Sequence, residues 1–352
     1  RPAEEQAGWF PIYWGWWLTG ADFAAMRERA QTILGDVRSV ADAEVQLQAR
    51  HCVWAIDFNV GRHDSCLAAV EEGLELYELG RGRENLTLYA GHDAKVCGLG
   101  QKGLSLWLTG QCASANRSVS ESRDWAQSLG HLGSLAHAYD IEAMFHRYRR
   151  DFGSLRQVAA AMQHLADHHG VPALSTKARI FEGWCIGLTG DPRRGRDLVE
   201  QNFAVQQQID TVEDFPVYCD MLAELMAATG DGKTGLDLLA NAIQEAERTS
   251  HRYWLAELHR RRALLLWQTR APRVEVIAAL EAALQIALDQ NAAALLLSAA
   301  ASAQALGVTA QVDAELQHHV TAAQAQLEPG LPLVECPDGL PPGGSSPTFL
   351  VM

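Results

Sequence analysis

A short phrase recurs along this 352-residue chain, and its spacing constrains the fold more than any other feature. WWLTG ends at Gly20, LWLTG at Gly110, IGLTG at Gly190 and AATG at Gly230, so the intervals are 90, 80 and 40 residues. These intervals lie close to multiples of 40. They indicate a structural unit of about forty residues that is copied along the chain.

Each copy of the phrase lies between two apolar patterns with helical spacing. After Gly61, for example, Cys66, Val70 and Leu74 fall on one stripe of a helix. Glycine at the turn suits the left-handed residue that ends a helix. We therefore expect turns at Gly20, Gly61, Gly110, Gly153, Gly190, Gly230 and Gly307, with Ala271 in the missing place, and essentially no sheet.

These patterns predict an all-α fold, an α-solenoid of about eight helical hairpins stacked in a right-handed superhelix. The hairpins are expected at 8–34, 43–79, 92–129, 131–169, 171–209, 214–249, 251–290 and 291–327. Six of the twelve prolines lie between Pro329 and Pro347. We therefore expect a helical repeat domain over 1–327 and a Pro/Gly-rich, disordered tail or linker over 328–352.

Composition narrows the choice of partners. The chain carries 43 acidic and 29 basic residues and a formal net charge of −14, which argues against nucleic acid and anionic lipid as partners. RPAEEQAGWF at the start has neither an initiator methionine nor a signal-peptide pattern. We expect a cytoplasmic piece of a longer protein. The seven cysteines include no CxxC, which favours buried reduced thiols over a disulfide framework or a zinc ribbon.

Several stretches resemble one family of bacterial proteins. TSHRYWLAELHRRRALLLW (249–267), LTLYAGHDAKVCGLGQKGLSLWLTG (86–110), LGHLGSLAHA (129–138) and GDGKTGLDLLANAI (230–243) carry the resemblance. They are similar to the C-terminal TPR-like helical-repeat region of bacterial STAND/AAA-type signalling ATPases. Those proteins are often fused to class III adenylate/guanylate cyclase or transcription-activator domains. The resemblance covers about residues 8–307 and fails after Gly307.

The resemblance implies a non-catalytic sensor or interaction region. Such a region binds a protein or a small effector and regulates an upstream NTPase or nucleotide cyclase in the same polypeptide. An autonomous scaffold for protein–protein interaction, with no effector, is the alternative. An enzyme built on helical repeats ranks third, because no nucleophile–base pair, carboxylate pair or metal cluster emerges from the sequence. No cofactor is expected.

Three stretches resemble nucleotide-binding motifs but lack the context that such sites need. Residues 98–103 match GxGxxG inside a helical pattern, whereas a dinucleotide site needs a preceding strand. Residues 230–234 resemble a Walker A loop, but Ala227 replaces its first glycine. Asp151, Phe152 and Gly153 match a kinase triplet at a position where we expect a turn. We interpret all three as structural.

Other residue patterns have a functional and a structural interpretation. His164 and His168 are four residues apart on one helix, but no third zinc ligand can be assigned, so we expect no metal there. The tryptophans near the turns are interpreted as core residues rather than an aromatic cage. The segment with Tyr89, His92 and Asp93 lies in the longest break between repeats (80–92), and these three residues are candidates for partner or effector binding. Asp93 could equally cap the next helix.

A basic ridge is the last candidate site. In a solenoid the turns inside the hairpins line one edge, and that edge carries Arg62, Arg149, Arg150, Arg193, Arg194, Lys233, Arg270 and Arg273. The favourable interaction of a cation with the C-terminal end of a helix explains the presence of Arg149 and Arg150. This interaction does not explain Arg193, Arg194 and Arg273, because these residues begin the second helix of their hairpins. We expect Arg149, Arg150, Arg193, Arg194 and Arg273 to dock an acidic surface of a partner or an upstream module.

Overall fold

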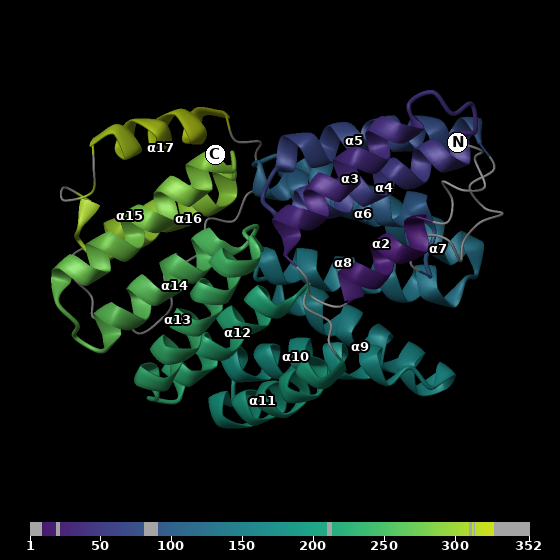
Figure 1. Ribbon diagram of the computed structural model, residues 1–352. Helices are drawn as coiled ribbons and strands as arrows, with labels where there is room; N and C mark the ends of the chain where they lie inside the picture. The colour runs from purple at the N-terminus through teal and green to yellow at the C-terminus, as the bar shows by residue number, and fades with distance from the viewer. Residues whose placement is uncertain are drawn as a thin grey trace.

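The structure is a computed structural model, and it describes residues 9–18, 22–80, 91–209, 213–309, 312 and 314–326. The tail predicted for 328–352 and the turn glycine Gly20 lie outside the described residues. Within those ranges the chain is helical and contains no strand, as predicted. The helices follow one another in pairs (Figure 1).

The helices match the predicted hairpins in number and place. The hairpins are formed by α2 (Trp9–Leu18) and α3 (Phe23–Val37), α4 (Ala43–Asn59) and α5 (His63–Leu79), α6 (Ala94–Leu108) and α7 (Cys112–Leu129), α8 (Leu132–Tyr148) and α9 (Phe152–His169), α10 (Pro172–Thr189) and α11 (Pro192–Ile209), α12 (Phe215–Ala228) and α13 (Gly232–Thr249), α14 (Leu255–Gln268) and α15 (Arg273–Asp289), and α16 (Ala293–Ala305) and α17 (Ala314–Gln326). The prediction of a helical solenoid is therefore confirmed for the described residues.

Within the hairpins, four of the predicted turn glycines have the expected left-handed conformation, and two do not. Gly61, Gly110, Gly230 and Gly307 have positive φ, as a left-handed residue after a helix requires. The prediction for Gly153 was wrong, because Gly153 lies inside α9 and Arg150 takes the left-handed conformation at φ 55°. Gly190 has an extended φ of −174°. The sequence phrase IGLTG therefore ends α10 without a residue in the left-handed conformation.

The core runs continuously through the stacked hairpins. Trp54, Trp184 and Trp254 are at most 1% exposed, which confirms that these tryptophans are core residues. The glycines of the GxGxxG match lie in α6, where small residues let neighbouring helices approach. A Cβ on Gly100 would lie 2.4 Å from Ile141 Cδ1 of α8, and one on Gly103 would lie 2.5 Å from Val119 Cγ2 of α7. The motif is therefore a packing feature.

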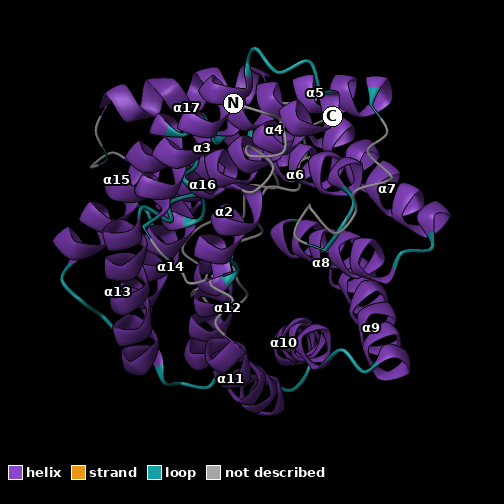
Figure 2. Ribbon diagram, turned by 45° about the vertical axis from the view of Figure 1, so that its right-hand side comes forward, coloured by secondary structure: helices purple, strands orange, loops and turns teal. Residues whose placement is uncertain are grey.

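The solenoid curves until its second hairpin meets its seventh. The Asn59 carbonyl oxygen at the end of α4 accepts hydrogen bonds from the backbone N–H groups of Arg252 (2.9 Å) and Tyr253 (3.1 Å). His251 Nε2 lies 2.8 Å from Asn59 Oδ1, and the His251 ring stacks on Phe23 of α3 with centroids 4.4 Å apart. Figure 2 shows the hairpins following one another around a ring. We call this contact between residues about 190 positions apart the closure.

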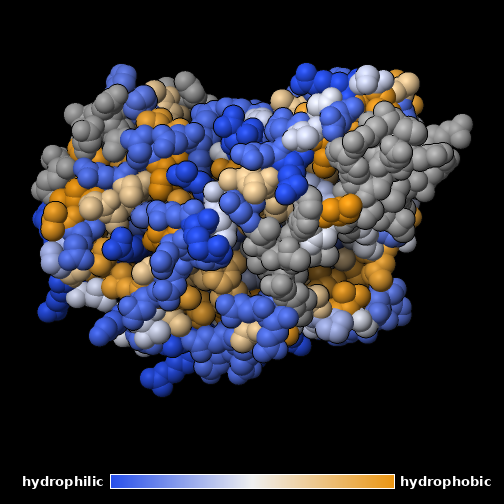
Figure 3. Space-filling view, viewed as in Figure 1, coloured by the Kyte–Doolittle hydropathy of each residue, from blue (hydrophilic) through white to orange (hydrophobic). Residues whose placement is uncertain are grey.

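The outer surface offers little apolar area to a partner. Among the described residues, the exposed large hydrophobic side chains are Ile12, Leu79, Val205 and Val274, which lie on four different helices. Hydrophilic residues cover much of the face in Figure 3, and apolar residues form separate patches between them. No helix in the described part of the chain is both long and apolar enough to cross a membrane.

Candidate functional site

A small pocket lies on the inner side of the ring, next to the closure. Its walls come from α4, α6 and α8 and from the segments that lead into α12 and α14. The free volume is about 40 Å³, more than the roughly 10–15 Å³ that one water molecule needs. The pocket can therefore hold one side chain or a small functional group, with the rest of a larger ligand outside.

Aromatic and polar side chains line this pocket together with the apolar side chains of Leu104, Ile141 and Met144. Phe58, Tyr148 and Tyr253 supply aromatic rings, while Asn59, Gln101, His137, Asp140, Glu213 and Asp214 supply polar atoms. Three of the polar residues are acids, and one ammonium lies among them. Lys177 Nζ of α10 pairs with Asp140 Oδ2 and, at 2.7 Å, with Asp214 Oδ2. The acids therefore outnumber the cation by three to one.

Asp140 is the most unusual of these acids. Its Oδ1 atom is buried and has no hydrogen-bond partner among the described residues. Burial raises its pKa to about 6, Lys177 opposes the rise, and the carboxylate of Asp214 adds to it. An ionised carboxylate oxygen without a donor is costly in a buried site. A ligand that brings a hydrogen-bond donor, and above all a cationic donor, would relieve that cost.

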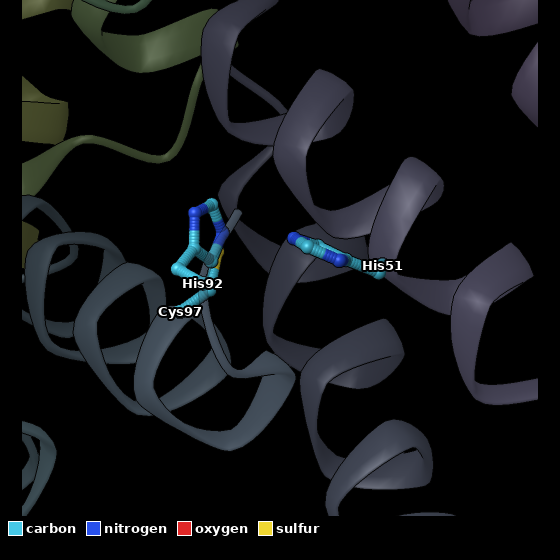
Figure 4. Close-up of side chains that lie close together, drawn as sticks. All are labelled: His51, His92 and Cys97. Carbon is cyan, nitrogen blue, oxygen red and sulfur yellow. The ribbon is translucent and has the colours of Figure 1, made fainter. Parts of the chain in front are cut away.

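A group of three histidines, of which His51 is buried and His92 and His137 are half-buried, lies on the other side of the pocket wall. The His137 ring, which lines the pocket, stacks on the His92 ring with centroids 3.9 Å apart. The His92 ring in turn meets the His51 ring of α4 edge-on at 5.4 Å. Nitrogen atoms of His51 and His92 and the Cys97 sulfur lie within 4.8 Å of one another (Figure 4). Residues of three consecutive hairpins thus converge here.

Burial keeps these imidazoles neutral. It holds the pKa of His51 and that of His92 well below the usual value, and it lowers the pKa of His137 to about 3. Nε2 of His92 and Nε2 of His137 are buried and have no hydrogen-bond partner among the described residues. The group therefore combines neutral imidazoles with nitrogen atoms that no described residue satisfies.

The segment that carries His92 and Cys97 is held by several hydrogen bonds. Asp93 is the N-cap of α6 and accepts from the backbone N–H groups of Lys95 (3.0 Å) and Val96 (3.1 Å). Its other oxygen accepts from Tyr77 at 2.7 Å, and its backbone N–H donates to Ser134 Oγ at 2.9 Å. Asp93 is fully buried. The capping interpretation of Asp93 is therefore confirmed, whereas its role in partner binding stays a prediction.

The other residues that the sequence suggested as ligands or binding residues lie in different places. Tyr89 lies outside the described residues. His92 joins the histidine group. His164 and His168 are exposed, and their rings are 6.3 Å apart, so they lie away from the buried group. Sequence reasoning missed His51, Cys97 and His137, because they are separated in the chain and match no ligand spacing.

The predicted basic ridge is placed partly inside the protein. Arg150 Nη1 donates to both oxygens of Glu224, at 2.9 and 3.0 Å, and its guanidinium lies over the Trp184 ring. Arg149 is half-buried, whereas Arg193 and Arg194 are exposed near the start of α11. Arg273 is exposed and donates to the Gly307 carbonyl oxygen at 2.5 Å. Docking of an acidic surface at these residues stays a prediction.

Arg150 belongs to a buried ionic network that sequence reasoning missed. The network joins Arg147, Arg150, Asp220, Glu224, Glu257, Arg260 and Arg261 across α8, α12 and α14. Arg261 donates to Asp220 Oδ1 at 2.7 Å and to Glu224 Oε1 at 2.8 Å. Burial opposes ionisation of Asp220, but Arg261 and Arg147 outweigh it and lower its pKa to about 2. Each carboxylate oxygen of Asp220 and Glu224 has at least one donor.

The prediction that the cysteines are buried is confirmed for those that the structure describes. Cys52, Cys66, Cys97, Cys112, Cys185 and Cys219 are buried and free. Burial raises the pKa of the Cys66 and Cys185 thiols to about 12, so these thiols are protonated at neutral pH. Cys336 lies outside the described residues.

Sequence comparison gives one long match. The chain is 40% identical over 308 residues, 88% of its length, to an uncharacterised protein of Rhizobium meliloti (strain 1021). It spans 30% of that relative's length. No family model matches the sequence. The chain is thus similar to one part of a considerably longer bacterial protein.

Structure comparison supports the fold. The chain is similar to the crystal structure of a Rap protein complexed with competence and sporulation factor, with a TM-score of 0.56. The match covers 92% of this chain and 98% of the Rap chain at 12% sequence identity. Rap proteins have TPR-like helical repeats, so the comparison agrees with the TPR-like hairpins described above. At this identity the likeness shows the fold alone.

Proposed function

We propose that this chain is a non-catalytic helical-repeat module that binds a peptide or small effector through the pocket beside the closure. The group that enters the pocket is a cationic hydrogen-bond donor, such as an amino terminus or a lysine or arginine side chain. The observation that carries the proposal is Asp140, whose buried Oδ1 has no donor among the described residues and which forms, with Glu213 and Asp214, a group of three acids against the one ammonium of Lys177.

The fold and the surface support the same proposal. Helical repeats form curved surfaces that bind extended ligands on their inner side. The similar Rap structure is a complex with competence and sporulation factor, so a chain of this architecture can hold a ligand. The large exposed apolar residues lie singly on separate helices, which gives a partner no apolar docking face in the described part of the chain.

The bound state is reported to another module of the same polypeptide. The relative is about three times longer than the stretch that this chain matches, since the match spans 30% of it. The resemblance noted in the sequence gives the class of that module, an NTPase or a nucleotide cyclase. A ligand shifts the module only if it binds one conformation of the ring more tightly than another.

Binding is tested by affinity selection and mass spectrometry with a library of short synthetic peptides, one half with free and one half with acetylated amino termini. The wild-type chain should retain peptides that carry a free amino terminus or a basic side chain. Asp140→Asn should lose them, whereas Asp197→Asn on the exposed face of α11 should retain them. Equal retention by wild type and Asp140→Asn would contradict the proposed site, and retention of no peptide would favour the scaffold without an effector.

Regulation needs a separate measurement in the longest native polypeptide that contains this chain. We expect its nucleotide turnover to change when a retained peptide is added, and the change to disappear in Asp140→Asn. Turnover that ignores the peptide, although the peptide binds, would separate binding from regulation and refute the second part of the proposal.

A further inference from the structure

The histidine group beside the pocket contains three atoms of the kind that bind transition metals. His51 comes from α4, while His92 and Cys97 flank the start of α6, and their ligand atoms lie within 4.8 Å of one another (Figure 4). Zinc bonds of about 2.0–2.3 Å to nitrogen and sulfur place tetrahedral ligand atoms about 3.3–3.7 Å apart. The observed group is therefore about one ångström wider than a formed site, which small side-chain rotations can close.

Packing alone does not explain this group. Aromatic contacts account for the position of the His51 ring, which lies 4.8 Å from both the Trp14 and the Trp54 rings. They do not account for Nε2 of His92 and Nε2 of His137, which are buried without a hydrogen-bond partner among the described residues. An atom left in this state lowers the stability of the folded chain. A metal ion at this place would satisfy His92, whereas His137 stacks on His92 but is not one of the three residues whose ligand atoms lie within 4.8 Å of one another.

The surroundings of Cys97 fit a metal-bound thiolate. Trp54 Nε1 donates to Cys97 Sγ at 3.4 Å, which is the kind of outer hydrogen bond that orients a ligand and tunes its charge. The Asp93 cap holds the backbone between His92 and Cys97 in place. Mixed imidazole and thiolate ligands suit zinc, whereas calcium and magnesium need oxygen ligands.

We propose that His51, His92 and Cys97 bind a zinc ion, with His137, which stacks on His92, as the candidate for the fourth position after a small shift. The site joins the second hairpin to the third, and through the His92–His137 stack it reaches the fourth. Zinc here would brace the wall of the effector pocket. The inference stands independently of what the pocket binds, because it rests on different atoms.

The experiment uses the full chain without a polyhistidine tag. After purification and dialysis, the metal content is measured by inductively coupled plasma mass spectrometry, and we expect about one zinc per chain. The chelated protein is then titrated with Co²⁺, which should produce a thiolate-to-cobalt charge-transfer band and tetrahedral ligand-field bands. Added zinc should raise the melting temperature, because a ligand that binds only the folded state stabilises it.

Variants assign the ligands. Cys97→Ser should abolish the charge-transfer band, and His92→Gln and His51→Gln should each weaken zinc binding by at least about tenfold, as even outer-shell changes do at metal sites. Cys66→Ser and His63→Gln are matched controls, since both residues are fully buried and lie on α5. These controls should leave the metal content unchanged.

Two results would overturn the proposal. The first is wild-type protein that retains no zinc and gives no cobalt spectrum. The second is a cobalt spectrum without a thiolate band, or metal binding that the control variants weaken as much as the ligand variants do. Should Cys97→Ser fail to fold, the wild-type cobalt spectrum still decides, because only a sulfur ligand produces the charge-transfer band. A bound ion that proves to be copper would refute zinc as the metal.

Discussion

Two regions of this molecule bury polar groups, and they do so in opposite ways. In the ionic network, Asp220 and Glu224 are almost fully buried, and each of their carboxylate oxygens has a nearby donor. In the pocket and the histidine group, Asp140 Oδ1, His92 Nε2 and His137 Nε2 have no partner among the described residues. Both regions lie on the inner helices of the ring, so position alone does not cause the difference.

The contrast teaches how to separate structure from function in a helical repeat. In the ionic network every carboxylate oxygen of Asp220 and Glu224 has a donor, and the atoms left without a hydrogen bond among the described residues are the arginine nitrogens Arg147 Nε and Arg261 Nη2. Its acids therefore need no ligand, and its role is to hold α8, α12 and α14 in register. In the pocket and the histidine group the acid and the imidazoles themselves lack a partner, which a ligand or a metal ion would supply. The predictions below test this difference, beginning with the largest expected effect.

Removing an acid from the ionic network should be severe. In Asp220→Ala, Arg147 and Arg261 would remain buried without their shared carboxylate, which should lower the free energy of unfolding by about 3–5 kcal/mol. Urea unfolding followed by circular dichroism measures the loss. Asp237→Ala on the exposed face of α13 is the control and should stay within about 0.5 kcal/mol of wild type. A small loss for Asp220→Ala would show that the network is not essential to the fold.

The closure should be the next most sensitive feature. Asn59→Ala removes the Oδ1 atom that faces His251 Nε2 and leaves that buried nitrogen without its partner. The expected loss is roughly 1–3 kcal/mol of unfolding free energy. Small-angle scattering should also show a wider particle if the ring opens. Unchanged stability and an unchanged scattering curve would mean that the backbone hydrogen bonds of Asn59 suffice for closure.

Acid should weaken the closure before it weakens the ionic network. Burial lowers the pKa of His251 to about 3, so the folded state keeps it neutral, whereas the unfolded state takes up a proton below about 6.5. Its contribution is therefore complete above pH 6.5 and is lost as the pH falls toward 3. At pH 5.5 the loss is about 1.4 kcal/mol.

The pH effect is assigned to His251 by comparing unfolding free energies of wild type and His251→Gln at pH 7 and pH 5.5. The variant should lose about 1.2 kcal/mol less than wild type over this interval. The lowered pKa of Asp220, about 2, keeps the ionic network charged throughout it. Identical losses in the two proteins would exclude His251 as the source of the pH dependence.

The smallest effect on stability is expected in the pocket. Asp140→Asn removes a carboxylate whose ionisation burial disfavours, and Lys177 keeps Asp214 as its partner. The free energy of unfolding should change by no more than about 0.5 kcal/mol, although peptide binding should be lost. Thermal unfolding of the variant checks this value. A loss as large as that of Asp220→Ala would place Asp140 among the structural residues and end the comparison drawn above.

The sequence predicted the hairpins well because their determinants are local. Apolar stripes and turn glycines such as Gly61 and Gly110 act within one hairpin, and the structure has its helices where those signals place them. The turn at Arg150 shows the limit of such reasoning. A charged residue there takes the left-handed conformation, and its guanidinium binds Glu224, 74 residues away. No local pattern contains that contact.

The site was predicted only in part, since His92 and Asp93 were named and their partners were not. His51, Cys97 and His137 come together because the hairpins stack with a particular rotation, which is the sum of many small packing choices. The ligand spacings that identify metal sites in sequence apply when the ligands share one helix or loop. Here they are distributed over three hairpins, and only the curvature of the array brings them together.

The meeting of Asn59 with Arg252 and Tyr253 has a consequence for how this protein can evolve. Open repeat arrays gain and lose units easily, because each unit contacts only its neighbours. In a ring whose curvature is fixed, the number of hairpins between the two that meet cannot change. Insertion or deletion of a single hairpin between the second and the seventh would carry Asn59 past its partners. The length of this chain is therefore under a geometric constraint that an open array escapes.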